Sequence, residues 1–122
     1  MNFVGIDGTM FSPELRYTQS RKPVLTFSLG YRNGKGQDGK SDYGSIRVKA
    51  FGALASNAMK KLVERDKIVV CGRLVQEKWE KDGVKYYRDA IIANSIGSSI
   101  SPFDEDGAPG AMPQDEEVEV PV

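Results

Sequence analysis

Aromatic and cationic side chains alternate with aliphatic ones along residues 43–51. One parity carries rings and cations, namely Tyr43, Ser45, Arg47, Lys49 and Phe51. The other parity carries Ile46, Val48 and Ala50. Successive side chains of a strand point to opposite faces, so this strand would expose its rings on the face away from the aliphatic side chains. Leaving apolar surface in water costs a free energy of about 25 cal/mol per Å². Nucleic acid fits such a face, since bases stack on rings and Arg or Lys neutralise phosphates. The alternative is that Phe51 caps a helix end or fills a second small core.

The tryptophan lies in a similar setting. Trp79 stands between Lys78 and Lys81, just before the Asp-Gly pair at 82–83, which is a signal for a tight β-hairpin turn. Tyr86 is expected to pair back across this hairpin. A lone tryptophan usually packs in a core, but the scarcity of apolar neighbours here favours exposure. We expect single-stranded rather than duplex nucleic acid, because stacking needs unpaired bases and no helix has a dense basic face. RNA remains open.

Residues 34–41 match the pattern G-x-x-x-x-G-K-[ST] of nucleotide-binding loops. Such a loop holds phosphates only when a helix begins directly after it. Here Ser41 is followed by an alternating strand, and no parallel βαβ series is evident. We therefore reject nucleotide hydrolysis and interpret Lys35 and Lys40 as cations of a mobile hairpin tip that closes over a strand of nucleic acid.

The composition argues against an enzyme. The sequence contains no histidine, which removes the commonest general base and metal ligand. The single cysteine, Cys71, lies in the apolar run 68–71 and is expected to be a buried small hydrophobe rather than a reactive thiol. We expect no catalytic residue, no metal and no cofactor. Without a long apolar segment or a signal-peptide pattern, the protein is expected to be soluble and cytoplasmic, with no membrane contact.

The 122 residues suffice for one compact domain. The apolar spacing predicts an amphipathic helix over Ala53–Glu64. Period-2 alternation and β-branched runs predict strands at 2–7 and 14–18, joined by a Ser12-Pro13 turn, and at 23–32, 43–51, 67–81 and 84–96. This order predicts an all-β fold, a five-stranded oligonucleotide/oligosaccharide-binding (OB) barrel with one helix between strands 3 and 4. Another small β-barrel, or an open sandwich plugged by the helix, is the alternative.

Charge divides the chain into two parts. Seven of the seventeen acidic residues and none of the seventeen basic ones lie beyond residue 102, so the end carries −7 and the remainder +7. The stretch 98–122 is rich in Ser, Pro, Gly and acidic residues, a composition typical of disorder. We therefore predict a domain at 1–100 and a disordered acidic tail at 101–122. A basic body with an acidic arm suggests a polyanion-binding domain with a separate interaction segment, and a merely solubilising tail is the alternative.

Between about Asn2 and Ile100 the sequence resembles the bacterial single-stranded DNA-binding protein (SSB) family. The resemblance rests on an ordered set of short matches: Asn2, Val4, 13–18, 27–29, 47–55, 72–74, Trp79, 82–83 and Tyr86. It implies a homotetramer of OB folds that binds single-stranded DNA in replication, recombination and repair, associated with the nucleoid. By the same resemblance Phe51 and Trp79 stack bases and Arg16 and Arg47 lie on the DNA path. An OB fold that binds RNA or protein is the alternative.

The expected DNA-binding residues are therefore Arg16, Lys35, Lys40, Tyr43, Arg47, Lys49, Phe51, Lys78, Trp79 and Tyr86. The resemblance further implies that the tail recruits replication and repair proteins through Asp115, Glu116, Glu117, Glu119, Pro121 and Val122. Two departures from the family pattern stand out. Ser45 replaces an aromatic residue, with Tyr43 one period earlier on the same face, and the chain ends in Pro-Val without the usual terminal Phe.

Overall fold

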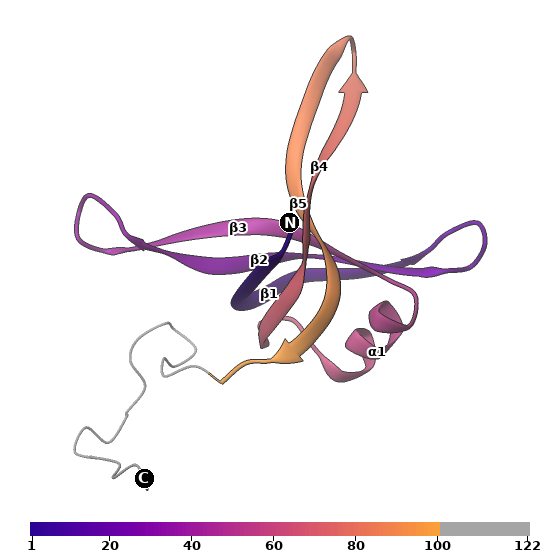
Figure 1. The fold of residues 1–122 in the computed structure, drawn as a ribbon, viewed down its shortest axis with the longest axis horizontal. Helices are drawn as coiled ribbons and strands as arrows, with labels where there is room; N and C mark the ends of the chain where they lie inside the picture. Colours follow the sequence, from indigo (N-terminus) through magenta and orange to yellow (C-terminus); the bar gives the residue numbers. More distant parts are fainter. Residues whose placement is uncertain (101–122) are drawn as a thin grey trace, which may run out of the picture.

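The structure is a computed structural model and describes residues 1–100. Its elements are β1 (Val4–Tyr17), β2 (Pro23–Lys35), β3 (Ser41–Phe51), α1 (Ala53–Lys61), β4 (Lys67–Lys81) and β5 (Val84–Ser98). The strands close into a barrel in the order β1-β2-β3-β5-β4 (Figure 1). Only the β3–β5 pair is parallel among these neighbours. The predicted all-β barrel with one helix between its third and fourth strands is confirmed. The predicted tail at 101–122, with its partner-binding residues, lies outside the described residues.

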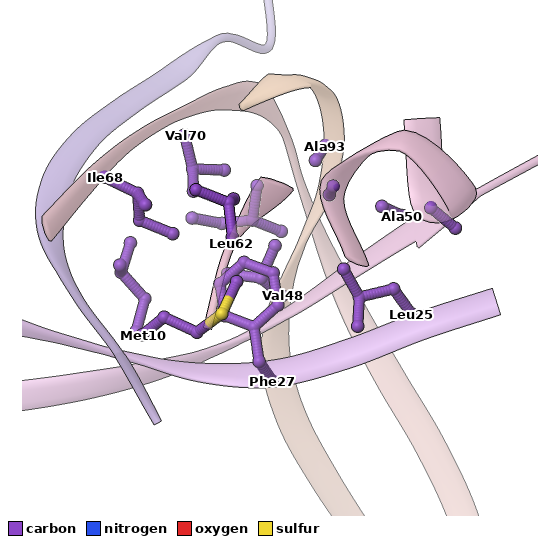
Figure 2. Packing of buried hydrophobic residues seen from close by; sticks show 13 residues of the cluster. Met10, Leu25, Phe27, Val48, Ala50, Leu62, Ile68, Val70 and Ala93 are labelled. Atoms are coloured by element: carbon purple, nitrogen blue, oxygen red, sulfur yellow. The ribbon is translucent and has the colours of Figure 1, made fainter. Parts of the chain in front are cut away.

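Apolar side chains at alternate positions of the strands fill the barrel interior. Leu25 and Phe27 of β2 and Val48 and Ala50 of β3 are fully buried. Figure 2 shows these side chains meeting Met10, Ile68 and Val70 in one cluster, to which Leu62 is added from the segment after α1. The alternation read from the sequence thus places the opposite parity of β3 on the outside of the barrel.

Residues 4–17 form one continuous strand, so the prediction of two segments joined by a Ser12-Pro13 turn is wrong. Ser12 adopts a φ of 54°, and the pairing with β2 shifts register between Phe11 and Glu14. This is a β-bulge, which bends a strand without ending its pairing.

Helix α1 ends at Lys61, three residues before the predicted end. Its start follows Gly52, whose φ of 67° turns the chain out of β3. At its end Leu62 is already extended, and the backbone N–H of Val63 donates to Asp66 Oδ2 at 2.9 Å. The helix stops early because the chain must return to the sheet, where β4 begins at Lys67.

The hairpin between β2 and β3 is longer than predicted. β2 continues to Lys35 and β3 starts at Ser41, so the loop contracts to residues 36–40. A strand follows the nucleotide-loop-like pattern, as expected. β5 likewise runs two residues further, to Ser98. Cys71 is half-buried rather than buried, because it points away from the barrel interior.

The β4–β5 hairpin projects beyond the barrel (Figure 1). Its turn is formed by Asp82 and Gly83, with φ values of 53° and 78°. Two consecutive positive φ angles define a type I′ hairpin turn, which matches the twist of the flanking strands. We call the projecting part, residues 76–89, the arm. The described part of the chain has no helix long and apolar enough to cross a bilayer.

Candidate nucleic-acid interface

The side of β3 that faces away from the interior carries the predicted rings and cations. Tyr43 is 57% exposed and Phe51 44% exposed, while Arg47 and Lys49 are half-buried. Phe51 is the last residue of β3 before the Gly52 turn, so its ring stands at the strand's end. The prediction that Phe51 is exposed rather than packed in a second core is confirmed.

Arg16 lies in the same row as Phe51. The register pairs Arg16 with Val24 across β1 and β2, and Val24 with Phe51 across β2 and β3. Arg16 Nε donates a hydrogen bond to Glu14 Oε1 at 2.6 Å, so the two side chains form an ion pair. Both side chains are largely exposed, so this pair is screened by water and contributes little to stability.

The arm holds a second aromatic group on this face. Trp79 and Tyr86 face one another across the hairpin, and their rings stack with centroids 5.7 Å apart and planes 15° from parallel. The guanidinium carbon of Arg88 lies 5.2 Å from the Trp79 ring centre. Trp79 remains 43% exposed. The predicted pairing of Tyr86 and the predicted exposure of Trp79 are both confirmed.

An ion-pair network joins β3 to the arm. The Glu77 carboxylate accepts a hydrogen bond from Lys49 Nζ through Oε2, and it accepts two from Arg88 through Oε1, at 3.0 Å from Nε and 2.9 Å from Nη2. The hydrogen bond from Lys49, supported by those from Arg88, lowers the pKa of Glu77 below its ordinary value of 4.5, although partial burial opposes this shift. Because Arg88 also lies over Trp79, β3 and the arm present one continuous surface, which we call the outer face.

Arg47 occupies the middle of β3. Its Nε atom is buried and makes no hydrogen bond within residues 1–100. A buried donor without a partner is costly. An incoming phosphate oxygen would be a suitable acceptor for this guanidinium.

The structure separates the other predicted cations from this face. Lys35 and Lys40 stand at the β2–β3 hairpin, far along the sheet from Arg16 at the other end of β2 (Figure 1). At about 3.3 Å per residue, β2 alone spans roughly 40 Å. Lys78 lies opposite Tyr87, on the side of the arm away from Trp79. The expected residues therefore form an extended track with outlying cations rather than one compact pocket.

Three residues of the outer face were not predicted. Arg88 and Glu77 share the parity of Tyr86 and Trp79, so period-2 counting along the arm would have found them. The ring of Phe11 was missed because residue 11 lies between the two expected strand segments, where the structure has one continuous strand. The ring lies over Gly30, where a Cβ atom would come within 2.9 Å of Phe11 Cε2, and it is 38% exposed.

Comparison with known proteins identifies the family. The model of the Single-strand binding protein family matches residues 1–99. The chain belongs to this family. It is 34% identical over 117 residues to the single-stranded DNA-binding protein of Aquifex aeolicus, covering 88% of this chain and 78% of that protein. The crystal structure of the small single-stranded DNA-binding protein from Streptomyces coelicolor superposes with a TM-score of 0.66 at 25% identity, covering 82% of this chain and 97% of the other. The SSB resemblance read from the sequence is confirmed.

Proposed function

We propose that this SSB-family chain binds single-stranded DNA with little sequence preference and without catalysis. The observation that carries the proposal is the outer face, on which exposed rings of Phe51, Trp79 and Tyr86 stand among the cations Arg47 and Lys49. Bases stack on the rings, and the cations neutralise the phosphates between them. Family membership supports the same ligand.

The type of side chain accounts for the lack of sequence preference. Every base has a π face, so stacking on a ring tolerates any sequence. A duplex hides these faces inside its base stack, which is why unpaired strands are the proposed ligand. Arg16 would extend the track past Phe51, and Lys35, Lys40, Tyr43 and Lys78 would contact a longer strand at its margins.

The proposal extends to the cellular role. A protein that coats unpaired DNA serves wherever strands are separated, namely replication, recombination and repair. We place it in the cytoplasm with the nucleoid. The domain would comprise residues 1–100 and the acidic tail residues 101–122, through which replication and repair proteins would be recruited.

We further propose that the chain assembles with itself as a homotetramer. Supporting this is an apolar patch away from the outer face, where Phe3 is 67% exposed and Val69 and Cys71 are half-buried. A Cβ atom on Gly5 would lie 3.6 Å from the Phe3 ring and 3.9 Å from Cys71 Sγ, so these two side chains are neighbours. Light scattering should give four times the chain mass, and a monomer would contradict this part of the proposal.

The binding proposal is tested by titrating the protein with oligo-dT. Trp79 is the only tryptophan, so quenching of its fluorescence reports stacking at the arm. The logarithm of the affinity should fall with the logarithm of salt concentration, with a slope of about −0.7 per phosphate neutralised. Absence of quenching, or tighter binding to duplex, would refute the proposal. Preference for oligo-U would indicate an RNA-binding module, and binding to neither would indicate a protein-interaction module.

A further inference from the structure

The outer face contains one acidic residue among the side chains that β3, β4 and β5 contribute to it. The strand registers place Arg47, Lys49, Glu77, Trp79, Tyr86 and Arg88 together on this face. Glu77 lies in the middle of this set. A carboxylate at that position repels any phosphate that approaches the proposed DNA track.

Both oxygens of Glu77 are held by cations from two different strands. Lys49 reaches Oε2 from β3, and the Arg88 guanidinium binds Oε1 from β5 with two nitrogens. The side chain of Glu77 is only 19% exposed and that of Lys49 only 27%. The pair is therefore less screened by water than the Glu14–Arg16 pair on β1, where the exposures are 49% and 76%.

An ammonium and a guanidinium that converge on one oxyanion form the donor set that phosphate groups require. We propose that Lys49 and Arg88 form a binding site for one backbone phosphate, and that Glu77 occupies this site in the free protein as an internal competitor. This inference rests on the proposed binding of single-stranded DNA. When a strand binds, the phosphate takes the place of the Glu77 carboxylate.

The same exchange affects the tryptophan. Arg88 lies over the Trp79 ring at 5.2 Å while two of its nitrogens are bonded to Glu77. Release of Arg88 from Glu77 would let the guanidinium follow the phosphate and leave the ring free to accept a base. Phosphate binding and base stacking would thus be linked through one arginine.

The exchange of carboxylate for phosphate also affects the salt dependence of binding. A phosphate that displaces the Glu77 carboxylate pairs with Lys49 and Arg88 but leaves the carboxylate without its cations. The number of charges paired at this position then changes little, so few salt ions are released there. Glu77→Gln removes the competitor and should tighten binding to oligo-dT roughly three- to tenfold at low salt, with the log–log salt slope steeper by up to about 0.7, the value for one phosphate.

Glu80→Gln is the matched control. Glu80 lies on the same strand, three residues away, but on the opposite side of the arm, where it pairs with Lys85 in the register and has no ion pair within residues 1–100. The same loss of charge there should change affinity less than about twofold and leave the slope unaltered. If Glu77→Gln binds no more tightly than Glu80→Gln, the inference is overturned. Weaker binding would also overturn it, because Glu77 would then orient the two cations rather than compete for them.

Arg88 is tested separately. Arg88→Gln alone should weaken binding with a slope shallower by up to about 0.7, and it should remove most of the gain when combined with Glu77→Gln. A double variant that keeps the full gain would overturn the assignment of Arg88 to the phosphate. Arg88→Gln alone tests that assignment even if Glu77→Gln does not fold. Failure of the wild-type protein to bind oligo-dT would instead refute the proposed function itself, which distinguishes the two claims.

Discussion

Phe51 and Trp79 reach the surface for different reasons. Phe51 is the last residue of β3, before the chain turns at Gly52. Its side chain points away from the barrel interior, so the ring is exposed. Trp79 lies on the arm, beyond the end of the barrel, where neither face of the hairpin has a core to cover it. Neither ring is part of the buried cluster, so both are available to a ligand at little cost to the fold.

Phe51→Ala and Trp79→Ala should therefore each weaken oligo-dT binding by about 1 to 3 kcal/mol, the range for one stacked base. Thermal unfolding should stay close to that of the wild type. Tyr17→Ala is the control, because Tyr17 is 65% exposed but takes the opposite parity to Arg16 at the end of β1. A variant that unfolds would show that its ring supports the core after all.

Glu77 makes the stability of the barrel depend on pH. Its pKa is lowered in the folded state by Lys49 and Arg88, so the folded protein binds this proton less readily than the unfolded chain. The ion pairs therefore stabilise the protein above a pH of about 4.5 and lose this contribution as the pH falls through the lowered pKa. Urea denaturation should find wild type more stable than Glu77→Gln near neutral pH, with the difference shrinking as the pH falls below the ordinary Glu value of about 4.5. A difference independent of pH would contradict this account.

At the scale of the elements, close strand contact depends on particular glycines. Gly72 lies at the register shift between β4 and β5, where a Cβ atom would come within 2.0 Å of the Ile92 carbonyl oxygen and 2.9 Å of Ala93 Cα. Both neighbours are backbone atoms, so they move only if the strands separate. The barrel therefore requires glycine at this position.

Gly72→Ala should lower the free energy of unfolding by about 1 to 3 kcal/mol, as overpacking does. Gly97→Ala on β5 serves as the control, because its Cβ would meet Val69 Cγ1 at an ordinary 3.6 Å. Chemical denaturation measures the free energy of unfolding of both variants. Equal stability of the two variants would mean that the strands can part without cost at Gly72.

At the scale of the whole molecule, residues 1–102 carry a net charge of +7 and residues 103–122 a net charge of −7. If the tail competes with DNA for the cations of the outer face, a chain ending at residue 101 should bind oligo-dT more tightly than the full chain at low salt. The advantage should vanish near 1 M salt, where the screening length falls to about 3 Å. Amide substitution of Asp115, Glu116, Glu117 and Glu119 in the full chain should have the same effect in part. Equal affinities with and without the tail would exclude the competition.

Local patterns in the sequence were sufficient for the order of strands and helix, the exposed rings and the arm. Period-2 alternation sorted β3 into an inner and an outer side, because a strand repeats every two residues whatever surrounds it. The Asp-Gly pair at 82–83 predicted the tight hairpin, since its residues accept positive φ. These features depend on neighbours in the chain, which a sequence displays directly.

The tertiary structure decided which distant residues meet. Met10 and Leu15 both pack toward the core although their spacing is odd, because the bulge between them shifts the register. The meeting of Lys49 with Glu77 and Arg88 follows from the pairing of β3 with β5 and of β5 with β4. Such contacts depend on barrel closure and on strand register. Both are set by the packing of all five strands together, so no single segment of sequence encodes them.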